Sequence, residues 1–264
     1  MPAAHSGNSF FAPLAQSFIV LFGWMGAMWS FAAITLAAIP IGRALRAEPV
    51  SSQAAAAIHA REPGLKAALQ DALANRSYLL LHAGFYTCGF HIAFLVTHLP
   101  GEVQLCGLPA DVASWSIAII GLANIAGSLL AGWGVQHFRS KYLLSGIYAS
   151  RAMMIAIYLP APKTPITFYV FAAGLGLTWL STVPPTVSVV GKLFGTRHLA
   201  TLFGLTLLSH QIGGFFGAWV GGIVVVRSGT YDSMWYADIA LAASAALLNL
   251  PIREPRMAAA LEPA

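Results

Sequence analysis

Charged side chains are scarce in this sequence. Asp, Glu, Lys and Arg make up only 9 % of its 264 residues, 58 % are hydrophobic, and the mean hydropathy is +0.72. In an ordinary soluble domain about a quarter of the residues are charged. This composition excludes a soluble globular protein. At about 20 residues per crossing, the apolar content is enough for about seven membrane spans.

The sequence also lacks the marks of a secreted or a catalytic protein. Two cysteines are too few for a disulfide framework, and free thiols are favoured over a bridge because Cys88 lies in an apolar run and Cys106 in a polar connection. The first dozen residues contain no Lys or Arg, so the first span is expected to act as its own insertion signal. No Walker loop, HExxH or GxSxG motif occurs, which predicts no enzyme activity and no cofactor.

Carboxylates are missing from the centres of the apolar segments. All nine Asp and Glu are predicted to lie in loops or at span edges, Asp238 among them. We therefore expect no proton relay or sodium site that depends on a mid-membrane carboxylate. Any ion coupling within this sequence would have to use histidine side chains. The last apolar segment contains no lysine, which excludes a retinal Schiff base.

What the sequence does contain is seven long apolar segments. They lack the two-residue alternation of a membrane barrel, so they predict an all-α membrane protein of about seven transmembrane helices. The segments are Leu14–Ile41, Ser77–Leu99, Val112–Val135, Tyr142–Leu159, Thr164–Val190, Leu199–Val226 and Trp235–Ile252.

The longest polar stretch separates the first segment from the other six. Pro49 and Pro63-Gly64 interrupt it, and from Leu65 its apolar residues recur at helical spacing, which predicts an amphipathic helix on the membrane surface. The predicted organisation is an extra helix in residues 1–42, a cytoplasmic linker in residues 43–76 and a six-helix unit in residues 77–264.

The basic residues predict the orientation. If residues 43–76 are cytoplasmic, 11 of the 14 Lys and Arg lie on that side, only Lys163 and Arg227 lie on the other, and Arg151 lies within a span. This asymmetry predicts a multi-pass protein of the inner (plasma) membrane, with its N-terminus outside and its C-terminus in the cytoplasm. The basic excess thus marks a membrane face, and we expect no nucleic-acid partner.

Arg151 is the most conspicuous polar residue within a span, since it lies near the predicted midplane. One interpretation is a cation that binds an anionic solute. The other is a structural arginine that pairs with helix-end carbonyls or with polar groups of another helix.

Histidine and amide side chains form a second set of candidates. His91 is the deepest of three histidines in the second segment, Asn124 is the main polar residue of the third, and His210-Gln211 lies in the sixth. Each either lines a solute path or makes hydrogen bonds between helices. The histidine spacing in the second segment does not fit a metal site.

Small residues and prolines predict how the helices meet. Gly213, Gly217 and Gly221 form two successive GxxxG steps, which allow close helix packing. Pro184-Pro185 predicts a kink in the fifth segment, because two prolines remove two helical donors.

Three passages resemble the C-terminal half of a major facilitator superfamily transporter. The first, after the third segment, contains Gly132, Gln136, His137, Arg139 and Lys141, with Gln136 and His137 in place of the Asp-Arg pair of the family's cytoplasmic loop signature. The other two are Trp179–Gly204 and Ser209–Gly214, which resemble the oxalate/formate and monocarboxylate branch.

This resemblance implies that the seven segments correspond to helices six to twelve of the family. It implies a truncated or partial secondary transporter for a small, anionic organic solute, whose path we expect to include Arg151, His91, Asn124, His210 and Gln211. The alternative is a non-transporting remnant or a membrane interaction subunit. The expected partners are the bilayer, the solute, and either a second copy or the missing N-terminal half.

Overall fold

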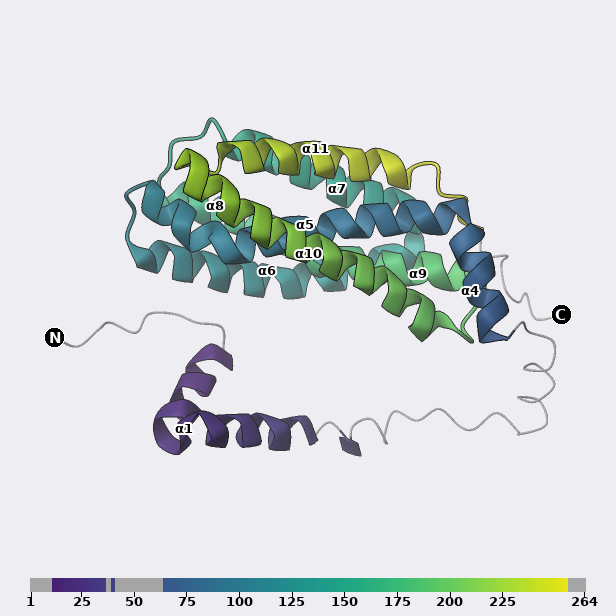
Figure 1. Ribbon diagram of the computed structural model, residues 1–264, viewed down its shortest axis with the longest axis horizontal. Coiled ribbons are helices and arrows are strands. Elements are labelled where there is room, and N and C mark those ends of the chain that lie inside the picture. The colour runs from purple at the N-terminus through teal and green to yellow at the C-terminus, as the bar shows by residue number, and fades with distance from the viewer. Residues whose placement is uncertain (1–10, 37–38, 41–63, 256–264) are drawn as a thin grey trace. The chain divides into compact units, whose positions relative to one another are not determined.

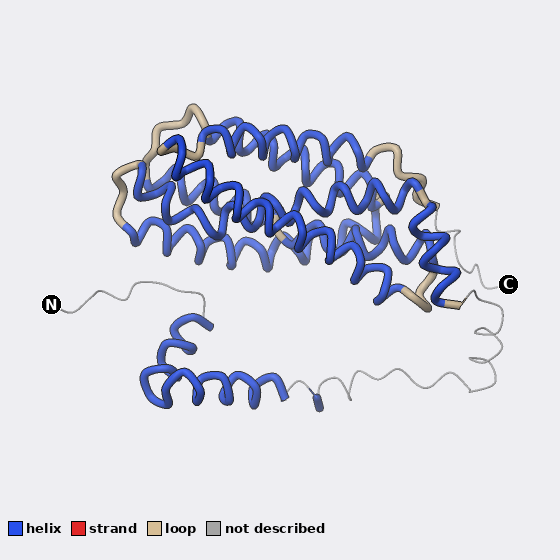
Figure 2. The backbone as a smooth tube through the Cα atoms, viewed as in Figure 1, coloured by secondary structure: helices blue, strands red, loops and turns tan. Residues whose placement is uncertain are grey.

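The computed structural model describes residues 11–36, 39–40 and 64–255, and every regular element in these ranges is a helix (Figure 2). This confirms the predicted all-α class. The chain divides into two compact units, of which the smaller is Asn8–Gly64 and the larger takes in everything from Leu65 onward.

The described helix of the smaller unit is α1 (Phe11–Leu36), and it is broken. Gly23 has φ 69° and ψ 174°, a conformation that only glycine adopts readily. The described part of the predicted segment Leu14–Ile41 is therefore helical but interrupted at Gly23. The apolar helix around and beyond the break is Leu21–Leu36, which is shorter than the length needed to cross a bilayer directly.

The helices of the larger unit follow the predicted segments closely. They are α4 (Leu65–Ala74), α5 (Arg76–Leu105), α6 (Ala110–His137), α7 (Ser140–Tyr158), α8 (Pro165–Thr178), the short 3-10 helix η1 (Leu180–Thr182), α9 (Val183–Phe194), α10 (Leu199–Ser228) and α11 (Asp232–Asn249). In the described chain, α5, α6, α10 and the α8–α9 stretch Pro165–Phe194 are long and apolar enough to cross a membrane. Helices α7 and α11, at 19 and 18 residues, are shorter.

Three closely packed pairs, α5 with α10, α6 with α8, and α7 with α11, form the bundle (Figure 1). Glycines allow two of these approaches. A Cβ atom at Gly213 or Gly217 would lie under 3.0 Å from the backbone of α5, and one at Gly127 would meet the Leu177 carbonyl of α8. Gly221 faces the His98 ring of α5. The glycine stripe of α10 therefore faces α5.

The surface of the bundle is strongly apolar. Leu122 and Leu129 of α6 are 74 % and 70 % exposed, and Val226 of α10 is 86 % exposed. Such a surface is stable in a lipid environment and costly in water. At one end of the bundle α4 packs through Ala68 and Ala72 and leaves Leu65 and Leu73 exposed, so an amphipathic helix does form in the predicted place.

Candidate functional site: a helix break inside the bundle

The break between α8 and α9 is the main irregularity of the bundle. Helix α8 ends at Thr178, η1 forms one tight turn, and α9 begins at Val183 with Pro184 and Pro185 in its first turn. Proline is tolerated there because those nitrogens have no helical acceptor, but it cannot continue the helix from α8. The predicted kink is confirmed. The backbone groups freed by the break need other partners.

Arg151 of α7 supplies the donors for two of these backbone groups. Its Nη2 donates to the carbonyl of Trp179 at 2.9 Å and to that of Thr178, and its Nη1 lies 3.2 Å from the Cys88 Sγ atom. The side chain is 1 % exposed. The structure thus shows the helix-end carbonyl pairing that was one of the two interpretations. Among the described residues, no carboxylate forms an ion pair with Arg151.

Polar groups from the other helices reach the same break. The Asn124 Oδ1 atom of α6 accepts a hydrogen bond from the Leu180 amide at 2.9 Å, and the Cys88 thiol of α5 lies 3.4 Å from the Thr182 hydroxyl. Both cysteines are free, as predicted. The break is therefore a point where side chains of α5, α6 and α7 meet an interrupted helix.

His210 and Gln211 of α10 lie next to this cluster. The His210 Nδ1 atom is 3.2 Å from the Gln211 Oε1 atom, and its ring centroid is 4.9 Å from that of Phe85. Asn124 and His210 are half-buried and Gln211 is exposed, so these three side chains are accessible from the surface of the bundle in this conformation.

His91 is held in a different environment. Its Nδ1 atom pairs with the Asp238 Oδ2 atom midway along α5, and the two side chains are 2 % and 0 % exposed. The prediction that every carboxylate lies in a loop or at a span edge was therefore wrong for Asp238, which lies inside α11. Glu102 also lies within a helix, near the end of α5, and accepts a hydrogen bond from Tyr158 at 3.1 Å.

The sequence contains a signal for the position of Asp238 that hydropathy alone does not show. The buried face of α11 repeats at helical spacing, and the aspartate falls on it. The buried residues of that helix are Met234, Trp235, Asp238, Ala242, Ala245, Ala246 and Asn249. An acid on the small-residue face of an apolar helix has to meet a partner on the neighbouring helix.

The two other histidines of α5 also make contacts between helices. The His82 Nδ1 atom lies 2.6 Å from the Ser209 hydroxyl, while His98 lies 2.9 Å from the Ala218 carbonyl and 3.2 Å from the Tyr231 hydroxyl. Within the described ranges, no group of three His, Cys, Asp or Glu side chains could hold a metal ion.

The predicted loop passage runs from the last turns of α6 into the first turn of α7, and it divides into two parts. Gly132, Gln136 and His137 are partly to fully exposed and make local contacts, such as the His137 ring against Trp133 at 4.3 Å between centroids. Arg139 and Lys141 instead reach the segment that follows α11. The Arg139 Nη2 atom donates to the Glu254 carbonyl at 2.6 Å, and the Lys141 Nζ atom donates to the Leu250 carbonyl at 2.8 Å.

Glu254 supplies a carboxylate to this loop from another part of the chain. Its Oε1 and Oε2 atoms accept from the amides of Ser140 and Lys141, each at 3.1 Å, and so cap the N-terminus of α7. Its Oε1 atom also lies 2.6 Å from the Lys192 Nζ atom of α9. Three segments are thereby tied together at one end of the bundle.

The environment of Glu254 predicts a pH dependence. Burial acts to raise the pKa of this carboxyl, but the hydrogen bonds from Lys192, Lys141 and Ser140 together outweigh burial and hold the pKa below its usual value. A carboxyl with a lowered folded-state pKa stabilises the fold above its ordinary pKa, and this contribution is lost as the pH falls through the folded-state pKa.

We therefore expect Glu254→Gln to lower the free energy of unfolding at pH 7 by about 2 kcal/mol, the scale of hydrogen bonds to a charged group. The difference from the wild type should shrink as the pH falls from the ordinary pKa of a glutamate through the lowered folded-state pKa, because the wild-type carboxyl then becomes neutral as well. Thermal unfolding of both proteins across pH 3 to 8 measures this. The matched control is Asp111→Asn, because the side chain of Asp111 is exposed, whereas that of Glu102 is buried. Asp111→Asn should show no such pH-dependent difference in stability. A difference for Glu254→Gln that does not vary with pH would contradict the account.

The family of the chain follows from comparison with known proteins. The sequence model of the Major Facilitator Superfamily matches residues 3–218. The chain is 24 % identical to monocarboxylate transporter 13 of Rattus norvegicus over 91 % of this chain and 56 % of that protein. It is 24 % identical to the uncharacterized MFS-type transporter YcxA of Bacillus subtilis over 56 % of this chain and 37 % of that protein.

A third relative has an aromatic carboxylate in its name. The 4-hydroxybenzoate transporter PcaK of Acinetobacter baylyi is 22 % identical over 61 % of this chain and 36 % of that protein. The chain spans about half the length of the first of these relatives and less of the other two. With a family match over most of the sequence and a bundle of apolar helices, the chain is a multi-pass membrane protein that belongs to the major facilitator superfamily.

Proposed function

We propose that this chain takes part in transport of a small organic carboxylate, as the C-terminal half of a secondary transporter. The observation that carries the proposal is the interrupted helix α8–α9, with polar groups from several helices gathered around it. In secondary transporters, broken helices near the centre of a repeat are typical of solute sites, because their free backbone groups and terminal dipoles can contact the solute.

The charge of the region supports an anion. Arg151 brings a full positive charge into the interior, and in the described chain it contacts carbonyls and a thiol rather than a carboxylate. A solute carboxylate near the break would reduce the cost of that buried charge. Two relatives are named as transporters of carboxylates, one of monocarboxylates and one of 4-hydroxybenzoate.

We assign different roles to the five polar residues of the path. Asn124, His210 and Gln211 are accessible in this conformation and would contact the solute directly. Arg151 and His91 are buried and partnered, so they would act behind that surface, Arg151 by fixing the break and His91 by joining α5 to α11. The packing glycines Gly213, Gly217 and Gly221 would keep α10 close against α5.

The proposed topology retains the sequence-based organisation. Residues 1–42 would form an extra N-terminal helix, residues 43–76 a cytoplasmic linker, and residues 77–264 the six-helix half in the plasma membrane, with the N-terminus outside. The loop residues Arg139 and Lys141, held by the segment around Glu254, would then lie on the cytoplasmic side. The other half of the solute cavity would come from an N-terminal half or from a second copy.

A second candidate function is a non-transporting membrane subunit or transporter remnant. The observation that favours it is that Arg151 and His91 are buried and already partnered, so neither side chain is free to contact a solute in this conformation. Such a subunit would pack against another bundle and move no solute.

Counterflow in proteoliposomes tests the solute class. Vesicles that contain the purified full chain are loaded with unlabelled lactate or 4-hydroxybenzoate, and uptake of the labelled compound is followed. We expect uptake above that of protein-free vesicles, with competition by benzoate and at least tenfold weaker competition by benzamide, which has the same shape without the charge. Equal competition by the amide overturns the anionic solute. No uptake of any carboxylate favours the non-transporting subunit.

A further inference from the structure

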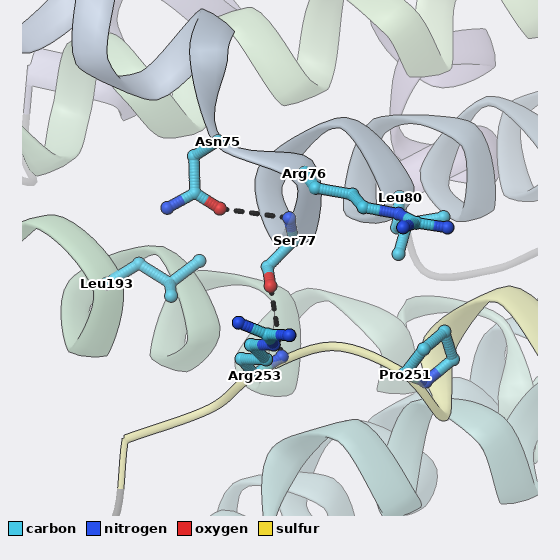
Figure 3. A pocket seen from close by; sticks show the side chains of 7 residues that line it. All are labelled: Asn75, Arg76, Ser77, Leu80, Leu193, Pro251 and Arg253. Carbon is cyan, nitrogen blue, oxygen red and sulfur yellow. Dashed lines mark hydrogen bonds between the residues drawn. The ribbon is translucent and has the colours of Figure 1, made fainter.

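A pocket of about 470 Å³ lies at the end of the bundle where α5 begins and the chain leaves α11 (Figure 3). It is separate from the helix break. The lining residues come from the start of α5, the end of α9 and the segment after α11. They are Asn75, Arg76, Ser77, Leu80, Leu193, Pro251 and Arg253.

Two arginines from distant parts of the sequence make this pocket cationic. Arg76 starts α5, and Arg253 follows α11, where its backbone amide donates to the Ser77 hydroxyl at 3.0 Å. Both side chains are exposed, and in the described chain neither has a carboxylate partner. The neighbouring Glu254 does not neutralise them, because its carboxylate is bound to Lys192 and to two amides of α7.

The start of α5 does not itself supply the binding groups. The Asn75 Oδ1 atom already accepts from the amides of Ser77 and Tyr78, at 2.9 and 3.3 Å, so the helix is capped (Figure 3). The attraction for an anion therefore comes from the two guanidinium groups. Guanidinium binds phosphate oxygens through paired, charge-assisted hydrogen bonds.

Apolar side chains also line the pocket. The apolar lining residues are Leu80, Leu193 and Pro251. Leu79, which precedes Leu80 in α5, is 48 % exposed. The adjacent helix α4 exposes Leu65 and Leu73 at 45 % and 55 %. A ligand with a phosphate next to hydrocarbon matches both parts of this surface, and basic pockets between spans at the membrane interface are typical lipid headgroup sites.

We propose that this pocket binds the phosphate of an anionic phospholipid, with Arg76 and Arg253 as its ligands and an acyl chain against the apolar side. The bound lipid would link the start of α5 to the segment after α11, beside the Glu254 contacts that tie that segment to α7 and α9. The shared chemistry is a phosphate anion, which a free phosphate ion could also provide.

Native mass spectrometry of the purified full chain tests the proposal. The protein is titrated with phosphatidylglycerol and, in parallel, with phosphatidylcholine, whose headgroup has no net charge. We expect the first lipid to bind tightly and the second weakly. Arg76→Gln/Arg253→Gln should weaken the binding of phosphatidylglycerol about 25-fold, because each of the two basic residues contributes roughly a factor of five at a membrane surface.

Lys66→Gln is the matched control, since it removes an exposed cation of α4 that does not line the pocket. The affinity of this variant for phosphatidylglycerol should stay within about twofold of the wild-type affinity. Intrinsic tryptophan fluorescence checks that all variants are folded. A titration with inorganic phosphate separates the sources of the anion, and competition in the low millimolar range without any preference for the lipid would overturn the lipid as ligand. Unchanged phosphatidylglycerol binding by the folded double variant would overturn the site itself.

Discussion

Substitution of His91 by leucine is expected to cost about 3 to 5 kcal/mol of unfolding free energy, the range observed when one partner of a buried ion pair is removed. The reason is the carboxylate that remains. Asp238 is 0 % exposed, its Oδ2 atom pairs with His91, and its Oδ1 atom has no hydrogen-bond partner in the described chain. Without the imidazole, a buried carboxylate would have no partner on either oxygen.

The measurement is equilibrium unfolding in mixed micelles with increasing SDS, followed by tryptophan fluorescence. His137→Leu is the matched control because that imidazole is exposed and contacts only its own helix, and it should change the free energy by less than about 0.5 kcal/mol.

A double variant separates pairing from simple loss of packing. Because a buried ion pair can be replaced by apolar residues at little cost, His91→Leu/Asp238→Leu should recover most of the stability lost in His91→Leu. If the double variant is instead destabilised by the sum of two large single effects, the pair is not the reason for the loss.

Substitution of Arg151 is expected to have the second largest effect. Arg151→Met removes the donors from two backbone carbonyls at the break, those of Thr178 and Trp179, which are shielded from water inside the bundle only in part. Each unsatisfied buried carbonyl costs about 1 to 3 kcal/mol, so we expect a loss of about 3 kcal/mol in the same unfolding assay. Arg151→Lys should recover only part of this, because one ammonium group cannot replace a planar fork that contacts two carbonyls and the Cys88 thiol.

Arg227→Met is the control for Arg151, since this arginine is exposed in the last turn of α10. Its free energy of unfolding should stay within about 0.5 kcal/mol of the wild-type value. Full rescue by Arg151→Lys would show that only the charge matters and would contradict the proposed role of the guanidinium geometry.

The course of the helices could be predicted because each apolar segment is long and its ends carry polar or basic residues. The kink at Pro184-Pro185 followed from proline chemistry alone, and the close contacts of Gly213 and Gly217 with α5 agree with the GxxxG pattern. The break at Gly23 was missed because hydropathy averages over a segment and does not register one residue with a positive φ.

The polar pairings were harder to predict because they depend on which helices become neighbours. Asp238 and His91 are 147 positions apart, and Glu254 meets Ser140 across 114. Hydropathy places an acid in a loop when it lies near the end of an apolar run, yet the helical repeat of α11 turns Asp238 into the bundle. For Arg151, the sequence left two interpretations open because the acceptors, two carbonyls, come from a backbone break and not from side chains.

The most direct test of the proposed solute site is carboxylate counterflow by the wild-type chain and by Asn124→Ala in parallel. Asn124 holds the Leu180 amide at the break and is accessible from the bundle surface, so the account predicts uptake by the wild type and a loss of at least nine-tenths of that rate in the variant. Gln136→Ala, at an exposed position in the last turn of α6, should transport normally. Equal rates for the wild type and a folded Asn124→Ala protein would contradict the account.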